Sequence, residues 1–156
     1  MSSSQLEHTL AQLSETLQRA QLLLPRTTQD VDWSAQAYVW QVRYGRGFLQ
    51  ALHQPRLQEL DDLLSIDRQK QAVLDNTEQF VCGLPANHVL LTGARGTGKS
   101  SLVRACLARF GAHGLRVIEV DRLDLHHLPE IVDLVRERAE RFIVFCDDLT
   151  FDAQHS

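Results

Sequence analysis

The chain has 156 residues, of which 44% are apolar and 23% are charged, a composition typical of a globular protein with one domain and room for an appendage. Its net charge of −4 provides no overall attraction to nucleic acid or to anionic membranes, although it leaves room for a local basic patch. No apolar run approaches the roughly 20 residues that span a bilayer, and residues 1–10 lack a signal-peptide pattern. We therefore expect a cytoplasmic protein with no membrane partner and no evident nucleic-acid partner.

Residues 3–24 are predicted to form an amphipathic helix, because leucines recur there at spacings of three and four and Pro25 follows. Such a helix packs on its own domain or on a second copy of the chain, and docking of a specific protein partner is the alternative. A second helix is predicted over 34–50, where one helix face would carry three aromatic side chains: Trp40, Tyr44 and Phe48. Core packing of these rings is favoured over a nucleic-acid stacking surface, because the nearby cations are just two arginines.

From residue 57 onward, the predicted elements include strands that alternate with helices. The sequence therefore predicts a helical N-terminal region over 1–56 and an α/β domain over 57–156. Helices are predicted over 57–64, 68–80, 100–110 and 129–141, and strands over 87–92, 115–120 and 142–146. Strands that alternate with helices indicate parallel βαβ units. The three cysteines, Cys82, Cys106 and Cys146, have no metal-binding spacing and have apolar neighbours, which favours buried free thiols.

The most specific pattern is G-x-x-x-x-G-K-[ST], met by Gly93, Gly98, Lys99 and Ser100 between a predicted strand and a predicted helix. Glycines permit the backbone angles that turn successive N–H groups toward an anion, and the positive end of the following helix points at the same place. The lysine supplies a positive charge to the β- and γ-phosphates, and the serine hydroxyl can bind Mg²⁺. We therefore expect a P-loop that binds ATP together with Mg²⁺.

A second candidate position follows the apolar strand over 142–146, which ends in Asp147 and Asp148. Parallel strands present ligands at their carboxyl ends, so Asp147 is predicted to hold the Mg²⁺ and Asp148 to orient the attacking water. Lys99 and Asp148 are thus the predicted catalytic residues, and Ser100 and Asp147 the predicted metal ligands. The predicted phosphate-binding residues are Gly93, Ala94, Arg95, Gly96, Thr97, Gly98, Lys99, Ser100 and Ser101.

Several parts of the sequence together resemble the AAA+ ATPases, and more closely a bacterial family of AAA+-type ATP-binding proteins known as domain-of-unknown-function family 815. The resemblance runs from about Ala37 to the end of the chain and rests on residues 61–70, 76–77, 86–102, 117–121 and 142–151. It implies a partial P-loop NTPase fold of AAA+ type, ATP hydrolysis, and a homo-oligomer or a protein partner. It also implies that Leu64, Ile66 and Asp67 lie near the adenine.

The sequence departs from the AAA+ pattern in two respects. The usual Asp-Glu pair after the acidic strand is Asp147-Asp148 here, and the chain stops at Ser156, before a sensor strand, an arginine finger and a helical lid could follow. The AAA+ sheet order places that later strand between the P-loop strand and the acidic strand. We therefore expect a C-terminally truncated form in which Val89–Leu91 has an unpaired edge. A P-loop kinase and a nucleotide-switched interaction module without catalysis are the alternative functions, and the lack of an N-K-x-D motif disfavours a GTPase.

Overall fold

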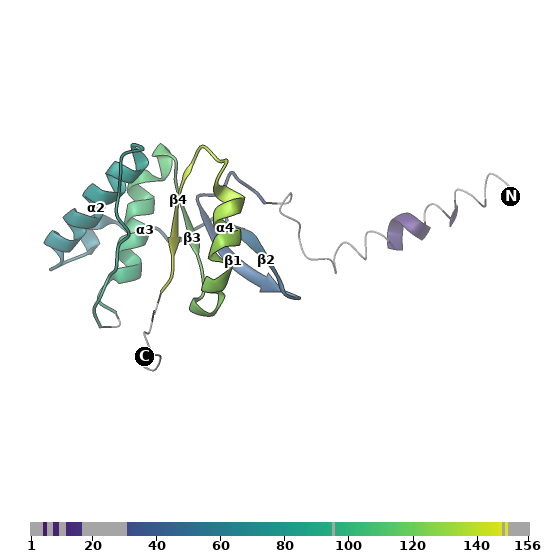
Figure 1. The fold of residues 1–156 in the computed structure, drawn as a ribbon, viewed down its shortest axis with the longest axis horizontal. Helices are drawn as coiled ribbons and strands as arrows, with labels where there is room; N and C mark the ends of the chain where they lie inside the picture. Colours follow the sequence, from purple (N-terminus) through teal and green to yellow (C-terminus); the bar gives the residue numbers. More distant parts are fainter. Residues whose placement is uncertain are drawn as a thin grey trace.

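The computed structural model describes residues 5, 8–9, 12–16, 31–94, 96–147 and 149. Its main part is an α/β arrangement in which a four-stranded sheet has helices packed against it (Figure 1). The residues described between 5 and 16 are helical, and the remainder of the helix predicted over 3–24 lies outside the described residues. Within the described ranges, no helix combines the length and the apolar character needed to cross a bilayer.

The sheet has the strand order β2-β1-β3-β4, with β2 antiparallel to β1 and the other neighbours parallel. The strands are β1 (Ala37–Arg43), β2 (Arg46–Leu52), β3 (Leu115–Glu119) and β4 (Arg141–Phe145). The strands predicted over 115–120 and 142–146 are thereby confirmed. The sheet is mixed, because an antiparallel hairpin joins its parallel part.

The helix predicted over 34–50 is wrong, because this segment is the β1–β2 hairpin. A spacing of four residues fits one face of a helix, but it equally fits one face of a strand, where side chains alternate with a period of two. The turn decides between them: Tyr44 and Gly45 both have positive φ, 51° and 71°, as a type I′ hairpin turn requires. Trp40 and Phe48 consequently lie on opposite faces of the hairpin rather than on one helix face.

The hairpin belongs to the main sheet, since β1 pairs in parallel with β3 through Ala37↔Val117 and Val39↔Glu119. The sheet therefore runs across the predicted division between 1–56 and 57–156. Only the part of the chain before the hairpin is left for a separate helical region.

Among the described residues from 31 onward, the sheet is accompanied by the helices α2 (Asp67–Val81), α3 (Lys99–Phe110) and α4 (Leu128–Val135), with 3-10 turns η2 (Leu60–Asp62), η3 (Gly111–His113) and η4 (Arg122–His127). The helices predicted over 68–80 and 100–110 are confirmed. The helix predicted over 129–141 ends early, because Arg141 already pairs with Leu115 in the sheet. The helix predicted over 57–64 is reduced to η2, and the Lys70 ammonium binds the Leu60 and Leu63 carbonyls that a longer helix would use.

Alternation along the strands divides the core between two sides of the sheet. On one side, Tyr38, Trp40 and Ile118 pack with Ile131 of α4. On the other, Ala37 and Val117 pack with Leu107 of α3, next to Ile143 and Phe145 of β4. Ser100 at the start of α3 lines one groove with Glu119 and Phe145, so the carboxyl ends of β3 and β4 lie close to the start of this helix.

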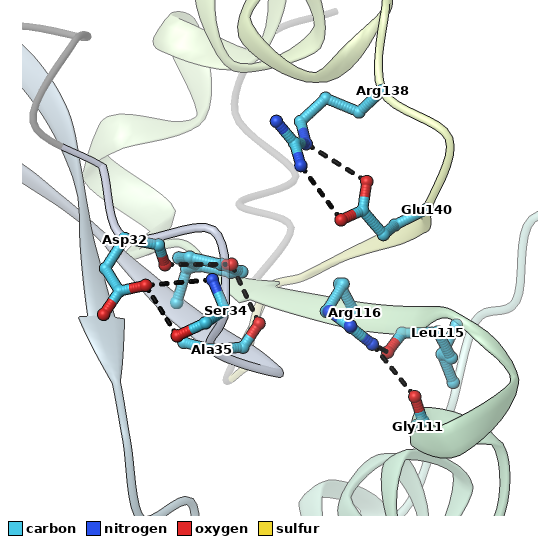
Figure 2. Close-up of polar contacts among 9 residues, drawn as sticks. Asp32, Ser34, Ala35, Gly111, Leu115, Arg116, Arg138 and Glu140 are labelled. Carbon is cyan, nitrogen blue, oxygen red and sulfur yellow. Dashed lines mark hydrogen bonds and ion pairs between the residues drawn. The ribbon is translucent and has the colours of Figure 1, made fainter.

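Polar side chains hold the amino-terminal edge of the sheet (Figure 2). Asp32 accepts hydrogen bonds from the Ser34 N–H and hydroxyl, at 2.9 and 2.6 Å, and the Tyr38 hydroxyl donates to the Ala35 carbonyl at 2.8 Å. Arg138 binds Glu140 through two hydrogen bonds of 3.1 and 3.0 Å. These bonds lower the pKa of Asp32 and of Glu140 below their ordinary values. This edge is the opposite end of the strands from Asp147.

The three cysteines are free, as expected, but they are not all buried. Cys106 is on the buried face of α3, where burial raises the pKa of its thiol. Cys82 directly follows α2 and is exposed, so the prediction of burial is wrong for this residue. Its apolar neighbours belong to the end of the helix, which lies at the surface. Cys146 is partly buried beside Asp147.

Candidate functional site

The glycine-rich loop connects an extended segment over 87–92 to the first turn of α3. The strand predicted over 87–92 is not part of the sheet, and Val89 and Leu90 are 49% and 64% exposed. The predicted strand is therefore wrong: Val89–Leu91 was expected to have one unpaired edge, but among the described residues it pairs with no strand on either side. Instead of strand partners, the segment is held by the Asn76 amide, which exchanges two hydrogen bonds of 2.9 and 2.8 Å with the Asn87 backbone. Leu91 anchors its other end in the core formed by Leu63, Leu102 and Ala105.

The loop turns into α3 at Gly98, which occupies the N-cap position with a φ of 86°. Only glycine adopts this left-handed conformation without steric cost. At the start of a helix the first N–H groups have no intrahelical partner, and here Leu102 is the first residue to bond, to the Gly98 carbonyl. Gly98 has no side chain that could cap the N–H groups of Lys99, Ser100 and Ser101 instead. The first turn of α3 contains no acidic residue. These features leave the positive end of the helix suited to an anion.

Lys99 folds back over the loop that precedes it. Its ammonium donates hydrogen bonds to the Gly93 and Ala94 carbonyls, each at 2.9 Å. The Thr97 hydroxyl closes the same turn by donating to Ala94 at 2.8 Å. An ammonium has three N–H donors, so two hold the loop in shape and the third is left for another acceptor.

The hydroxyl of Ser100 donates a hydrogen bond to the Asp147 carboxylate. Ser100 is in the first turn of α3, and Asp147 lies two residues beyond the end of β4, so two separate elements meet here. The residues that the sequence identified as metal ligands are thus brought together. Burial raises the pKa of the neighbouring Cys146 thiol, and the Asp121 and Asp147 carboxylates add to the shift. Cys146 therefore stays a neutral thiol near the Asp121 and Asp147 carboxylates.

Two of the predicted site residues, Arg95 and Asp148, lie outside the described residues. The predicted base-contacting segment does approach the loop: a Cβ built on Gly98 would lie 3.5 Å from Leu63 and 4.0 Å from Ile66. Leu64 is exposed beside them, and Asp67 is within 3.3 Å of the Lys70 ammonium. Sequence reasoning had selected Leu64 and missed Leu63, whose burial is set by tertiary packing against α3.

A groove of about 330 Å³ begins at Ser100 and was not anticipated from the sequence. It runs between one side of α3, which presents Val103, Arg104 and Leu107, and the strands β1, β3 and β4. Residues 54–56 after the hairpin border it. No local pattern could have indicated this groove, because its walls come from five separate segments.

The structure defines the chain as an α/β protein with a glycine-rich loop at the start of a helix and a carboxylate beside it at the end of an edge strand. Comparison with known families identifies it further. Residues 33–156 match the model of the family described as Protein of unknown function (DUF815), and the chain belongs to that family. Neither the curated proteins nor the solved structures contain a significant match to it.

Proposed function

We propose that this protein binds ATP with Mg²⁺ at the loop 93–101 and that it belongs, in mechanism, with the AAA+ ATPases. One observation carries the proposal: the Ser100 hydroxyl meets the Asp147 carboxylate, and the preceding residue, Lys99, has its ammonium held by the carbonyls of the glycine-rich loop. A serine hydroxyl and a carboxylate are hard oxygen donors, which Mg²⁺ prefers. The donor set therefore fits a magnesium ion that would neutralise charge on the β- and γ-phosphates.

The polypeptide supplies the remaining phosphate contacts. The N–H groups of Lys99, Ser100 and Ser101 point along the axis of α3 toward the bound phosphates, and the third N–H of the Lys99 ammonium donates to them. The two carbonyl contacts of Lys99 keep this ammonium in place before the nucleotide arrives. Ser100 and Asp147 would hold the Mg²⁺ through the hydroxyl and carboxylate oxygens that meet in the structure. The base lies against the apolar side chains near Gly98, with Leu63 and Ile66 as contacts.

For hydrolysis, Asp148 is the proposed residue that orients the attacking water, since it directly follows Asp147. A phosphoryl transferase and a nucleotide-switched interaction module are the alternatives, and each is separable by assay. A screen of phosphoryl acceptors that detects transfer to an acceptor other than water would favour the transferase. Nucleotide binding without turnover would favour the interaction module, with residues 1–56 as the proposed contact to a protein partner or a second copy.

A thermal-shift measurement tests the proposed binding. Ligand at about 100 times its Kd stabilises a protein by about 2.7 kcal/mol, which raises the Tm of a chain of this size by about 5–10 °C. We expect that rise with MgATP for the wild-type protein and for Arg109→Ala, which removes an exposed cation at the far end of α3. Lys99→Ala should lose most of the shift while its Tm without ligand stays close to that of the wild type. An equal MgATP shift in Lys99→Ala would refute the proposal.

A further inference from the structure

The two faces of the β1–β2 hairpin have opposite character. One face carries Tyr38, Trp40 and Leu49, which are buried in the core with α4. The other face is covered by α3 only where Ala37 and Leu52 border the groove. Beyond that point, toward the hairpin turn, its side chains are partly or fully exposed except for Phe48.

Four arginines gather along this less covered face, although the chain as a whole has a net charge of −4. Arg43 and Arg46 are directly opposite each other in the register next to the turn, a like-charge pairing that costs stability unless an anion screens it. Arg56 and Arg104 line the groove at the other end, beside Ala37. We call these four residues the arginine face.

The arginine face forms a stripe on one side of the sheet, with one pair of arginines at each end. Arg43 is an even number of residues from Ala37, so both side chains leave the same side of β1, and the same holds for Arg46 and Leu52 on β2. Six residues of strand cover about 20 Å. Among residues 31–94 and 96–147, none of the four arginines has an ion pair with a carboxylate, and the Glu119 carboxylate is the acidic group that borders the groove.

The turn that ends this stripe exposes an aromatic ring at a conformational cost. Tyr44 is 87% exposed and has a φ of 51°, a left-handed conformation that is unfavourable for a bulky side chain. A type I′ turn of this kind favours asparagine at the same position. The ring adds no burial to offset that cost. An exposed tyrosine held in a strained turn between two arginines is better explained by a ligand than by stability.

We propose that the arginine face and Tyr44 bind single-stranded nucleic acid. The arginine pair at the hairpin turn and the arginine pair at the groove contact phosphates at the two ends of the stripe, and Tyr44 stacks on a base beside the turn. Gln41 and Gln50, partly or fully exposed between the two pairs of arginines, add hydrogen-bonding groups without charge. A membrane surface is disfavoured because the exposed part of the stripe offers a single aromatic ring as an apolar anchor. This inference does not depend on the proposed ATP site, because Arg43, Tyr44 and Arg46 lie outside it.

The first experiment is fluorescence anisotropy of a labelled 20-nucleotide oligodeoxythymidylate, which forms no base pairs, titrated with the full chain without nucleotide. Each phosphate contact on a single strand contributes a slope of about −0.7 to the plot of log K against log salt concentration. Four arginine contacts therefore predict a slope near −3. Absence of salt-sensitive binding at low ionic strength would overturn the proposal.

Variants distinguish the contribution of base stacking to affinity from the contribution of charge and from any change in folding stability. Tyr44→Asn places a favoured residue in the turn, so it should keep or raise the Tm while it weakens binding about tenfold through loss of stacking. Arg43→Ala/Arg46→Ala should reduce the salt slope by about 1.4. The matched control Arg68→Ala/Arg109→Ala removes two exposed arginines elsewhere and should change the affinity less than twofold.

Two results contradict the proposal even if the oligonucleotide binds. One is an equal loss of affinity in the hairpin and control pairs, which would show that general charge is responsible. The other concerns competition at equal concentration of negative charge. If phosphatidylserine vesicles or polyaspartate displace the labelled oligonucleotide as well as unlabelled oligonucleotide does, the proposal is wrong. MgATP affinity should be the same in Tyr44→Asn and in the wild type, so failure at the hairpin is distinguishable from failure of the ATP proposal.

Discussion

The hydroxyl of Ser100 donates a hydrogen bond to the carboxylate of Asp147, a residue 47 positions later in the chain. The contact joins the first turn of α3 to the end of β4, and it requires both the glycine at the helix start and the parallel pairing of β3 with β4. If this pair shares a magnesium ion, removing the carboxylate should affect metal-dependent binding specifically. The loop and Lys99 would remain to hold the phosphates.

Asp147→Asn tests this directly. We expect MgATP affinity to fall at least tenfold toward the affinity measured in EDTA, because an amide binds Mg²⁺ more weakly than a carboxylate does. The control Asp133→Asn neutralises an exposed aspartate on α4 and should keep the full magnesium effect. Equal magnesium dependence in both variants, measured by competition with a fluorescent ATP analogue, would show that Asp147 is not a ligand.

Gly98→Ala should weaken both folding and binding. A residue with a side chain at φ 86° costs about 1–2 kcal/mol, and the altered loop would no longer direct the N–H groups of α3 toward phosphate. Gly114→Ala is the matched control, because Gly114 has a φ of 94° and open space around its Cα. Urea denaturation should show a similar loss of stability in both variants, and MgATP titration should show weakened binding in Gly98→Ala alone.

Gly47→Ala distinguishes the hairpin from the helix that the aromatic spacing suggested. In the hairpin, a Cβ at this position would lie 1.8 Å from the Trp40 ring, so we expect destabilisation of about 3 kcal/mol. In an exposed helix, the same change would stabilise by about 1 kcal/mol. The sign of the change in unfolding free energy therefore decides between the two structures, and a stabilised variant would rule out the hairpin.

The Arg138–Glu140 pair should make stability sensitive to acid. The pKa of Glu140 is lowered in the folded state, chiefly by the Arg138 hydrogen bonds. The stabilisation of the folded state by ionised Glu140 is therefore present above the unfolded pKa and is lost as the pH falls through the folded pKa. We expect the Tm to decline below about pH 4.5, the ordinary value for this group. Glu140→Gln should lower the Tm at pH 7 and flatten that decline. A decline of unchanged steepness would assign the acid sensitivity to other groups, such as Asp32.

The parts of the fold that the sequence predicted are those with one consistent local signal. For α2 and α3, helical spacing and the glycines at the end of α3 agree, and for β3 and β4 the apolar runs are too short for helices. The hairpin was missed because a spacing of four fits both periods, and the strained Tyr44-Gly45 turn lacks the usual asparagine. The strand over 87–92 was predicted from its apolar character, but a strand also needs a neighbour to pair with.

In the candidate site, too, the residues with a local sequence signal were predicted and those placed by tertiary packing were not. The motif identified Lys99 and Ser100, and position after an apolar strand identified Asp147, so the meeting of Ser100 and Asp147 follows from local patterns combined with parallel pairing. The approach of Leu63 to Gly98 and the arginine face depend on how distant segments pack, which no local pattern records. The metal-binding and phosphate-binding roles themselves stay predictions.

The most direct test of the account is isothermal titration of the purified full chain with ATP, in Mg²⁺ and in EDTA, for the wild type and Lys99→Ala. We predict one site per chain, at least tenfold tighter binding with Mg²⁺, and a loss of at least tenfold in affinity for Lys99→Ala. Absence of saturable binding at millimolar ATP, or equal affinity of the wild type and Lys99→Ala, would contradict the claim that this loop is an ATP site.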